Sequence, residues 1–222
     1  MTRDFEWWWN GFEAIADAPN GVARLREMIL SLAVQGHLVP QDANDEPASE
    51  LLKRIAQEKA RLVEQKKIRK SEPLAPVSED EAPFDLPESW VWVRVGDIGQ
   101  VVGGGTPQSE NSSYFSSDSI PWLTPADLYG LREKHVSKGR RDITEAGLKN
   151  SSAQLMPTDA VVFSSRAPIG YVAIAANPLA TNQGFKSCVP FVSGISEYLY
   201  YFLKHAAKTI DENATGTTFK EI

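Results

Sequence analysis

The sequence contains one cysteine, Cys188, and no long apolar run. A single cysteine excludes an internal disulfide framework and a cysteine-rich zinc site, and it fits a reducing, cytoplasmic location. A membrane-spanning helix needs roughly 20 consecutive apolar residues, and no segment of the chain approaches that length. Residues 1–10, MTRDFEWWWN, are acidic and aromatic, which is unlike a secretory signal peptide. We therefore expect a cytoplasmic protein that makes no membrane contact.

Basic residues are in the minority. The chain has 23 lysine and arginine residues against 29 aspartate and glutamate residues, and its formal net charge is −6. This average argues against nucleic-acid binding, which favours basic surfaces. Residues 131–141, LREKHVSKGRR, depart from the average with five basic residues and one acid. Because phosphate binding needs only a local basic patch, this segment is a candidate, although a solvated loop is the commoner explanation of a charge run.

The motifs of common enzyme sites are missing. Residues 103–107 read GGGTP, but a phosphate loop of the ATPase type needs a lysine after its last glycine, and Pro107 removes a backbone donor. His37, His135 and His205 are isolated, so no metal-ligand spacing is present. We expect no catalytic residue, metal or cofactor in this chain. The glycines are better explained by a sharp turn or the close approach of a neighbouring backbone.

A short helix is predicted over residues 20–36. Leu25, Ile29 and Leu32 follow the spacing of one buried helical face.

A longer helix is predicted from about Pro47 to Lys70, since proline suits the first helical turn. Leu52, Ile55 and Leu62 form a narrow apolar stripe of the kind found in a coiled-coil seam. An isolated helix more commonly packs on its own domain. The wide charged surround favours instead a coiled-coil-like segment that projects from the body and binds a partner helix through these three residues.

Residues 71–89 are rich in proline, serine and acid, which predicts a linker without regular structure. We therefore divide the chain near residue 80. Residues 1–80 form the N-terminal helical region and linker, and residues 81–222 form the second domain.

The second domain has the pattern of an α+β fold with a mixed or antiparallel sheet. Residues 90–102 alternate like a half-buried strand. Strands and helices do not alternate regularly, so a doubly wound nucleotide-binding sheet is not expected. Further short apolar runs and one helical segment follow at 120–123, 160–163, 171–176, 187–192 and 196–210.

Nine polar residues on predicted loops have the chemistry of a nucleic-acid contact. Arginine reads guanine with two hydrogen bonds and asparagine or glutamine reads adenine, each worth roughly 1–3 kcal/mol of discrimination. Asn182 could instead cap a turn. Three such groups on the loops of one domain without catalytic groups favour a binding module. The DNA-binding candidates are Arg132, Lys134, Lys138, Arg140, Arg141, Arg166, Asn182, Gln183 and Lys186.

Together these segments resemble a known family. From about residue 12 to the C-terminus, they are similar, in the same order, to the N-terminal half of the specificity subunit of type I restriction-modification enzymes. The resemblance implies that residues about 85–215 form the first target recognition domain and that 20–70 form its helical flank. The segments that carry it are LREMILSLAVQGHLVPQDANDEPASELLKRI, PFDLPESWVWVRVGDI, GGGTPQ, IPWLTPADL, FSSRAPIGYVAIA, ATNQGFKS and GTTFKEI.

The resemblance also implies partners. Such a subunit has no catalysis of its own and reads one half of a split site in double-stranded DNA. It docks modification (methyltransferase) subunits through its helices, and a restriction or motor subunit joins indirectly. S-adenosylmethionine, ATP and magnesium are then expected on the partner subunits only. Base specificity is the most variable property of the family, which shifts weight from Asn182 and Gln183 to residues 129–154.

Other interpretations stay open at this point. A full family member continues into a second recognition domain, so this chain is expected to be a fragment or a half-subunit that pairs with itself. A protein-docking scaffold without base readout and an enzyme with an unfamiliar site are the remaining alternatives.

Overall fold

The computed structural model describes residues 18–166 and 168–215. These residues fall into two compact units, one of residues 18–45 with 84–87, and one of residues 46–83 with the rest of the described chain. The first unit contains helix α2 (Gly21–Val34). Its predicted inner face is not buried: Ile29 is 43% exposed and Leu32 is 36% exposed. The described part of this unit offers no second helix or strand that would cover them.

Helix α3 (Ala48–Glu64) belongs to the second unit and ends before the predicted limit at Lys70. Lys66 takes a left-handed conformation with φ of 56°. The amide of Lys67 then donates to the carbonyl of Leu62 at 2.9 Å. This bond closes the last turn in the manner of a Schellman motif, which stops the helix.

The apolar stripe of α3 packs on its own domain at its centre, so the prediction of a projecting coiled-coil-like segment is not confirmed. Ile55 is 2% exposed and lies in a core cluster with Val161 and Leu199. Leu52 is half-buried against the same cluster, while Leu62 is half-buried outside it. The charged surround does not prevent this packing, because long side chains lay their stems on the body: the Lys59 ammonium lies 5.6 Å from the centre of the Phe191 ring.

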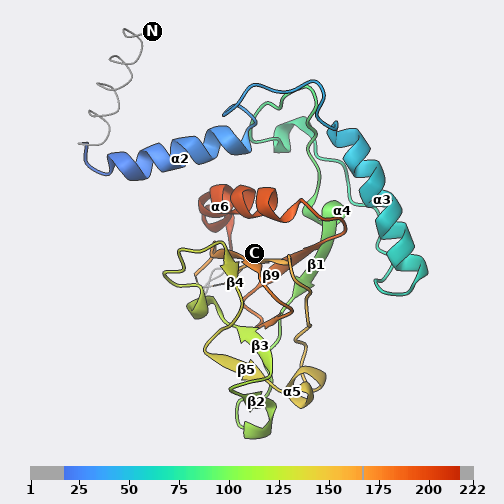
Figure 1. Cartoon of the computed structure of the whole chain (residues 1–222), viewed down its shortest axis with the longest axis vertical. Coiled ribbons are helices and arrows are strands. Elements are labelled where there is room, and N and C mark those ends of the chain that lie inside the picture. Colours follow the sequence, from blue (N-terminus) through green and yellow to red (C-terminus); the bar gives the residue numbers. More distant parts are fainter. Residues whose placement is uncertain (1–17, 167, 216–222) are drawn as a thin grey trace. The chain divides into compact units, whose positions relative to one another are not determined.

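The rest of the second unit contains two sheets (Figure 1). Pairs β4–β7 and β3–β8 are parallel and the other pairs are antiparallel, which confirms the mixed α+β prediction. In spatial order, the five-stranded sheet contains β1 (Gly99–Gly103), β9 (Lys186–Pro190), β6 (Val161–Phe163), β7 (Val172–Ala175) and β4 (His135–Val136). The four-stranded sheet contains β2 (Phe115–Ser116), β5 (Arg141–Ile143), β3 (Ile120–Leu123) and β8 (Ala180–Thr181).

Short helices and turns connect the strands. Helix α6 packs against β6 and β7, while α3 lies beside α4 (Figure 1) and contributes Ile55 to the cluster of Val161 and Cys188. The helical elements of this unit, besides α3, are α4 (Val95–Ile98), α5 (Glu145–Lys149) and α6 (Ser196–Asn213), with 3₁₀ turns η1 (Glu79–Glu81), η2 (Ser112–Tyr114) and η3 (Pro125–Asp127).

Strand β6 shows how the core is layered. Its alternating side chains point to opposite faces, as strand geometry requires. Val161 joins Ile55 beneath the helices, while Val162 joins a second cluster with Leu123 and Phe185. That second cluster therefore joins the five-stranded sheet to β3 of the four-stranded sheet. Cys188 packs beneath the helices as a small core residue, where burial raises the pKa of its thiol to about 12.

The predicted strand over residues 90–102 forms only at its end. Strand β1 begins at Gly99, after the single turn of α4. Before that turn, Trp90 and Trp92 contact Tyr198 and Phe202 of α6 at ring-centre distances of 5.5 and 6.1 Å. The alternation in this stretch therefore reflects packing of every second side chain on a helix, without a neighbouring strand to pair with.

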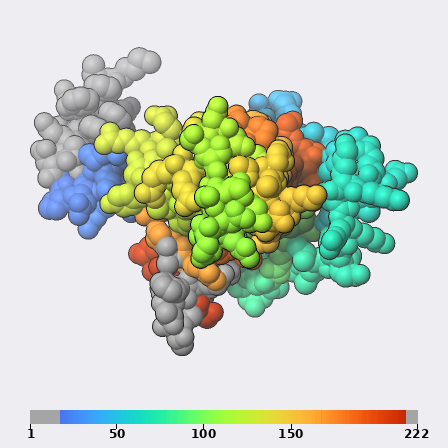
Figure 2. All heavy atoms as spheres, turned by 90° about the horizontal axis from the view of Figure 1, so that it is seen from below, coloured from blue at the N-terminus to red at the C-terminus, as the bar shows by residue number. Residues whose placement is uncertain are grey.

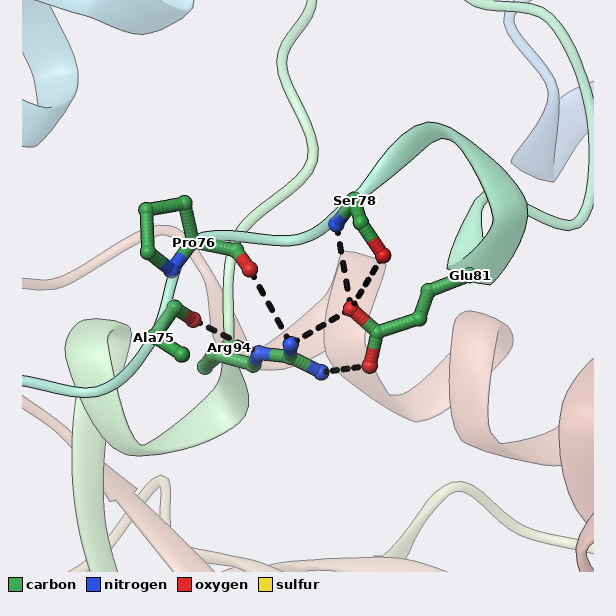
Figure 3. A network of polar contacts seen from close by, with 5 residues as sticks. All are labelled: Ala75, Pro76, Ser78, Glu81 and Arg94. Carbon is green, nitrogen blue, oxygen red and sulfur yellow. Dashed lines mark hydrogen bonds and ion pairs between the residues drawn. The ribbon is translucent and has the colours of Figure 1, made fainter.

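The proline-rich linker contains more structure than predicted. Its 3₁₀ turn η1 is tied to the body by Arg94, whose guanidinium donates to both carboxylate oxygens of Glu81 at 2.9 and 2.7 Å and to two linker carbonyls (Figure 3). Hydrogen bonds from Arg94 and then from Ser78 lower the pKa of Glu81 to about 2. The linker is thus fastened by one bidentate ion pair.

Among the described residues, no helix has both the length and the apolar composition needed to cross a membrane.

Candidate nucleic-acid interface

The glycine loop at 103–107 joins the two sheets. It leaves β1, and the amide of Gly105 donates to the carbonyl of Thr181 in β8 at 2.8 Å. The indole of Trp122 in β3 donates to the carbonyl of Gly105 at 3.0 Å. A Cβ atom on Gly104 would lie 1.8 Å from the Asn182 carbonyl oxygen. Gly104 and Gly105 therefore serve the close approach of protein backbone, and this loop is not a phosphate cradle.

The connection between β8 and β9 lies against this loop. The amide of Asn182 donates to the Leu123 carbonyl at 2.9 Å, and its side-chain oxygen accepts from the Gly184 amide at 2.9 Å. Asn182 thus caps a turn, the simpler of the two roles considered for it. Gln183 is exposed, and its side-chain oxygen accepts a hydrogen bond from the Thr106 hydroxyl.

Two further candidates come to the same place through backbone pairing. The Ser165 amide donates to the Gly184 carbonyl at 2.8 Å, which brings the following residue, Arg166, to this turn. Lys186 is exposed at the start of β9 and pairs with Gly103 in β1.

The turn η3 adds Arg140 to this region. The carboxylate of Asp127 is only 5% exposed, and one of its oxygens accepts from the amide and Nε of Arg140 at 3.0 and 3.1 Å. A Cβ atom on Gly184 would lie 3.0 Å from Pro125, so η3 abuts the β8–β9 turn. We call the region formed by residues 103–107, 124–127, 139–140, 164–166 and 181–186 the junction.

The junction collects five of the nine candidates, Arg140, Arg166, Asn182, Gln183 and Lys186. The rest of the basic run is distributed elsewhere. Figure 2 shows the face made largely by the four-stranded sheet and its loops, in green and yellow. On this sheet Arg141 stacks on the ring of Phe115 at 3.8 Å, and the ammonium of Lys138 donates to the Ser117 carbonyl at 3.0 Å. The basic residues of 131–141 therefore lie in at least two different places in the structure.

Lys134 and Arg132 lie outside the junction. Lys134 forms an ion pair with Glu197 of α6 at 2.7 Å and lies over the Tyr201 ring. The hydrogen bond between Lys134 and Glu197 raises the pKa of Lys134 and lowers the pKa of Glu197. Arg132 is exposed on the loop before β4. Among the described residues, no group of three His, Cys, Asp or Glu side chains is placed to hold a metal ion.

The sequence pattern of a known family covers the whole junction. Residues 87–222 match the family described as "Type I restriction modification DNA specificity domain". The chain belongs to this family. Within the specificity domain lie both sheets and α6, while α3 and most of the linker precede the matched region.

Named relatives agree with this assignment. The type I restriction enzyme MjaIX specificity subunit of Methanocaldococcus jannaschii is 44% identical over 62% of this chain and 32% of its own length. The EcoAI specificity subunit of Escherichia coli is 47% identical over 58% of this chain and 20% of its own length. The chain thus spans about a third or less of these relatives. A crystal structure of the HsdS subunit from Thermoanaerobacter tengcongensis aligns with a TM-score of 0.48 at 22% identity, over 78% of this chain and 40% of that one.

Sequence reasoning missed two residues that shape the interface of the specificity domain. Asp127 was not selected, although Thr124-Pro-Ala-Asp127 has the spacing of a capping box, and both of its reciprocal hydrogen bonds form. Thr106 was considered only as part of a possible phosphate loop, and its actual partner, Gln183, is remote in sequence. The first was recognisable from local spacing, whereas the second depends on the pairing of β1 with β9.

Proposed function

We propose that the junction is the surface through which this specificity domain contacts double-stranded DNA and reads one half of a bipartite target. The observation that carries the proposal is the gathering of three cationic and two amide side chains on loops that come from both sheets. Arginine, asparagine and glutamine are the side chains best suited to reading base edges, and the cations suit phosphates.

The chemistry belongs to other subunits in this proposal. The chain places methyltransferase subunits on DNA, and a restriction or motor subunit acts through the same assembly in the cytoplasm. S-adenosylmethionine, ATP and magnesium bind to those subunits. The support is that the named relatives are specificity subunits.

A local gathering of cations explains how an acidic chain can bind DNA. The formal net charge is −6, but phosphates respond to the local potential within about a Debye length of 8–10 Å. Arg140, Arg166 and Lys186 supply that potential at the junction. Lys134 and Lys138 lie outside the junction, where their ammonium groups bond to Glu197 and to the Ser117 carbonyl.

The test compares two variants with the same loss of charge. One replaces the three junction cations by alanine (Arg140, Arg166, Lys186), and the other replaces Lys134, Lys138 and Arg141. Binding of the full chain to a labelled random-sequence duplex is measured by anisotropy from low to moderate salt. We expect the junction variant to lose at least about tenfold in affinity and to flatten the salt dependence by up to about 0.9 per contact removed.

The control variant should stay within about threefold of the unaltered chain, since its cations lie outside the junction. Equal losses in both variants would show that only total charge matters. No measurable DNA binding by the unaltered chain at low salt would contradict the proposed function itself.

A further inference from the structure

Asp127 is a buried carboxylate at the base of the junction with all its hydrogen bonds directed at two neighbours. One oxygen accepts from the amide and hydroxyl of Thr124 at 2.8 and 2.7 Å. The other accepts from the amide and Nε of Arg140 at 3.0 and 3.1 Å. Burial raises the pKa of Asp127, but the hydrogen bonds from Thr124 and Arg140 outweigh it and lower the pKa overall. The group is therefore ionised at neutral pH.

Gly139 lets the basic run reach this carboxylate. A Cβ atom there would lie 2.8 Å from the Trp122 carbonyl oxygen and 3.2 Å from the carboxyl carbon of Asp127. Because these contacts are tighter than a side chain tolerates, only glycine allows the backbone to pass so close. The path of the chain into Arg140 is thus fixed from both sides.

The guanidinium of Arg140 is held by one edge. Its Nε group donates to Asp127, yet the side chain is 73% exposed. Over residues 18–166 and 168–215, the two terminal nitrogens of Arg140 have no hydrogen-bond partner. A guanidinium carries five N–H donors in one plane. With Nε bound to protein, the four N–H donors of the terminal nitrogens remain available to a ligand.

We propose that Asp127 is a positioning residue that orients the Arg140 guanidinium for a two-pronged contact with paired acceptors in DNA. The acceptors are either guanine O6 and N7 or two oxygens of one phosphate, which present the same geometry to an arginine fork. This inference rests on the proposed function. Holding the fork before binding reduces the side-chain entropy lost when the contact forms.

An exposed ion pair alone would not need this arrangement. The backbone hydrogen bond from Arg140 suffices to fix the loop, and Thr124 suffices to cap η3. The additional bond to Nε acts only on the side chain. Its consequence is therefore expected in DNA binding and not in folding.

A double-mutant cycle tests the proposal in the full chain. Affinity for duplex DNA is measured for the unaltered chain, Asp127→Asn, Arg140→Ala and the double variant. We expect Arg140→Ala to weaken binding about 5- to 150-fold, the range of a good bidentate contact. Asp127→Asn alone should weaken binding about 2- to 10-fold, as expected for one side chain that must be ordered on binding. In the Arg140→Ala background it should weaken binding by a smaller factor, because only the Thr124 and backbone-amide bonds of Asp127 remain to be disturbed there.

An equal effect of Asp127→Asn in both backgrounds would overturn the proposal, since Asp127 would then only support the fold. Arg140→Lys gives a second test that leaves Asp127 intact. It keeps the charge but removes the Nε donor and the planar fork. We expect it to lose nearly as much affinity as Arg140→Ala, and full retention of affinity would contradict the proposal.

Selection of bound sequences from a random duplex pool separates the two acceptors. Arg140→Ala should abolish the preference at one guanine position if the fork reads a base. It should instead weaken all sequences alike and lower the salt slope by about one if the fork binds a phosphate. If the junction variant loses DNA binding but the cycle shows no coupling, this inference fails while the proposed function stands. If the unaltered chain binds no DNA, the proposed function fails first.

Discussion

Helix α3 and the junction use their sequence-predicted interaction residues in opposite ways. The stripe of α3 was predicted to meet a partner, but Ile55 is 2% exposed within the core of its own unit. At the junction the backbone is buried and fixed while Arg140 is 73% exposed. An apolar stripe on a helix packs against any nearby apolar surface, including one in its own unit. A charged side chain on an anchored loop keeps its outer atoms for a ligand.

This contrast predicts that changes in α3 alter stability, whereas changes in junction side chains alter binding. Ile55→Ala and Arg140→Ala test this contrast directly, while Gly104→Ala and the titration of Glu81 test the fixed backbone of the junction and of the linker.

Ile55→Ala should lower the free energy of unfolding by about 2–5 kcal/mol, the usual range for an isoleucine removed from a packed core. Chemical denaturation measures the change. Leu62→Ala on the same helix is the control and should cost about 1 kcal/mol or less, because Leu62 lies outside the core cluster. If the two variants lose equal stability, α3 does not pack through Ile55.

Gly104→Ala should cost about 3 kcal/mol of stability, at the upper end of the overpacking range, because the new Cβ would meet the Asn182 carbonyl oxygen. Thermal unfolding followed by circular dichroism reports the loss. The adjacent Gly103→Ala has open space around the new Cβ and should leave the unfolding temperature nearly unchanged. Equal tolerance of both changes would argue against the close approach of the loop to β8.

Arg140→Ala should weaken DNA binding by about 1–3 kcal/mol without lowering the unfolding temperature. The neighbouring Arg141→Ala removes the same charge from a side chain that stacks on Phe115, so affinity should change by less than about twofold. Anisotropy titrations at one salt concentration compare them. A larger binding loss for Arg141→Ala would move the contact surface from the junction to the four-stranded sheet.

The Arg94–Glu81 pair should respond to acid. The pKa of Glu81 is lowered from 4.5 to about 2, so its stabilising effect is full above about pH 4.5 and is lost as the pH falls towards 2. Carboxyl chemical shifts followed by NMR should give a midpoint near 2 for Glu81. In Arg94→Ala the midpoint should return most of the way to its ordinary value. A Glu81 midpoint near 4.5 in the unaltered chain would mean that the linker is not fastened by this pair.

Local sequence patterns predicted most of the helices and strands but not what each of them packs against. The apolar runs at 120–123 and 160–163 became β3 and β6, because short buried strands are recognisable from composition alone. The run at 90–102 misled, since an extended segment whose tryptophans pack against a helix shows the same alternation as a strand.

The candidate interface was predictable in its residue types and not in its grouping. The basic run and the ATNQGFKS segment were both selected, but only strand pairing could show that Arg140 joins Asn182 and that Lys134 turns to α6. Ile55 was predicted to contact a partner helix, because an apolar stripe has the same sequence pattern whether it packs inside its own domain or against another protein. Such choices depend on residues far away in sequence, which periodicity does not report.

The amide of Arg140 is bound to Asp127 whatever side chain position 140 carries, provided that it is not proline. The loop therefore keeps its path when the side chain at position 140, the group that it offers to a ligand, is exchanged. If the fork reads a base, a change to glutamine, asparagine or lysine there would alter the preferred base without rebuilding the fold. Recognition domains that must acquire new targets by single substitutions would benefit from such a separation of anchor and reader.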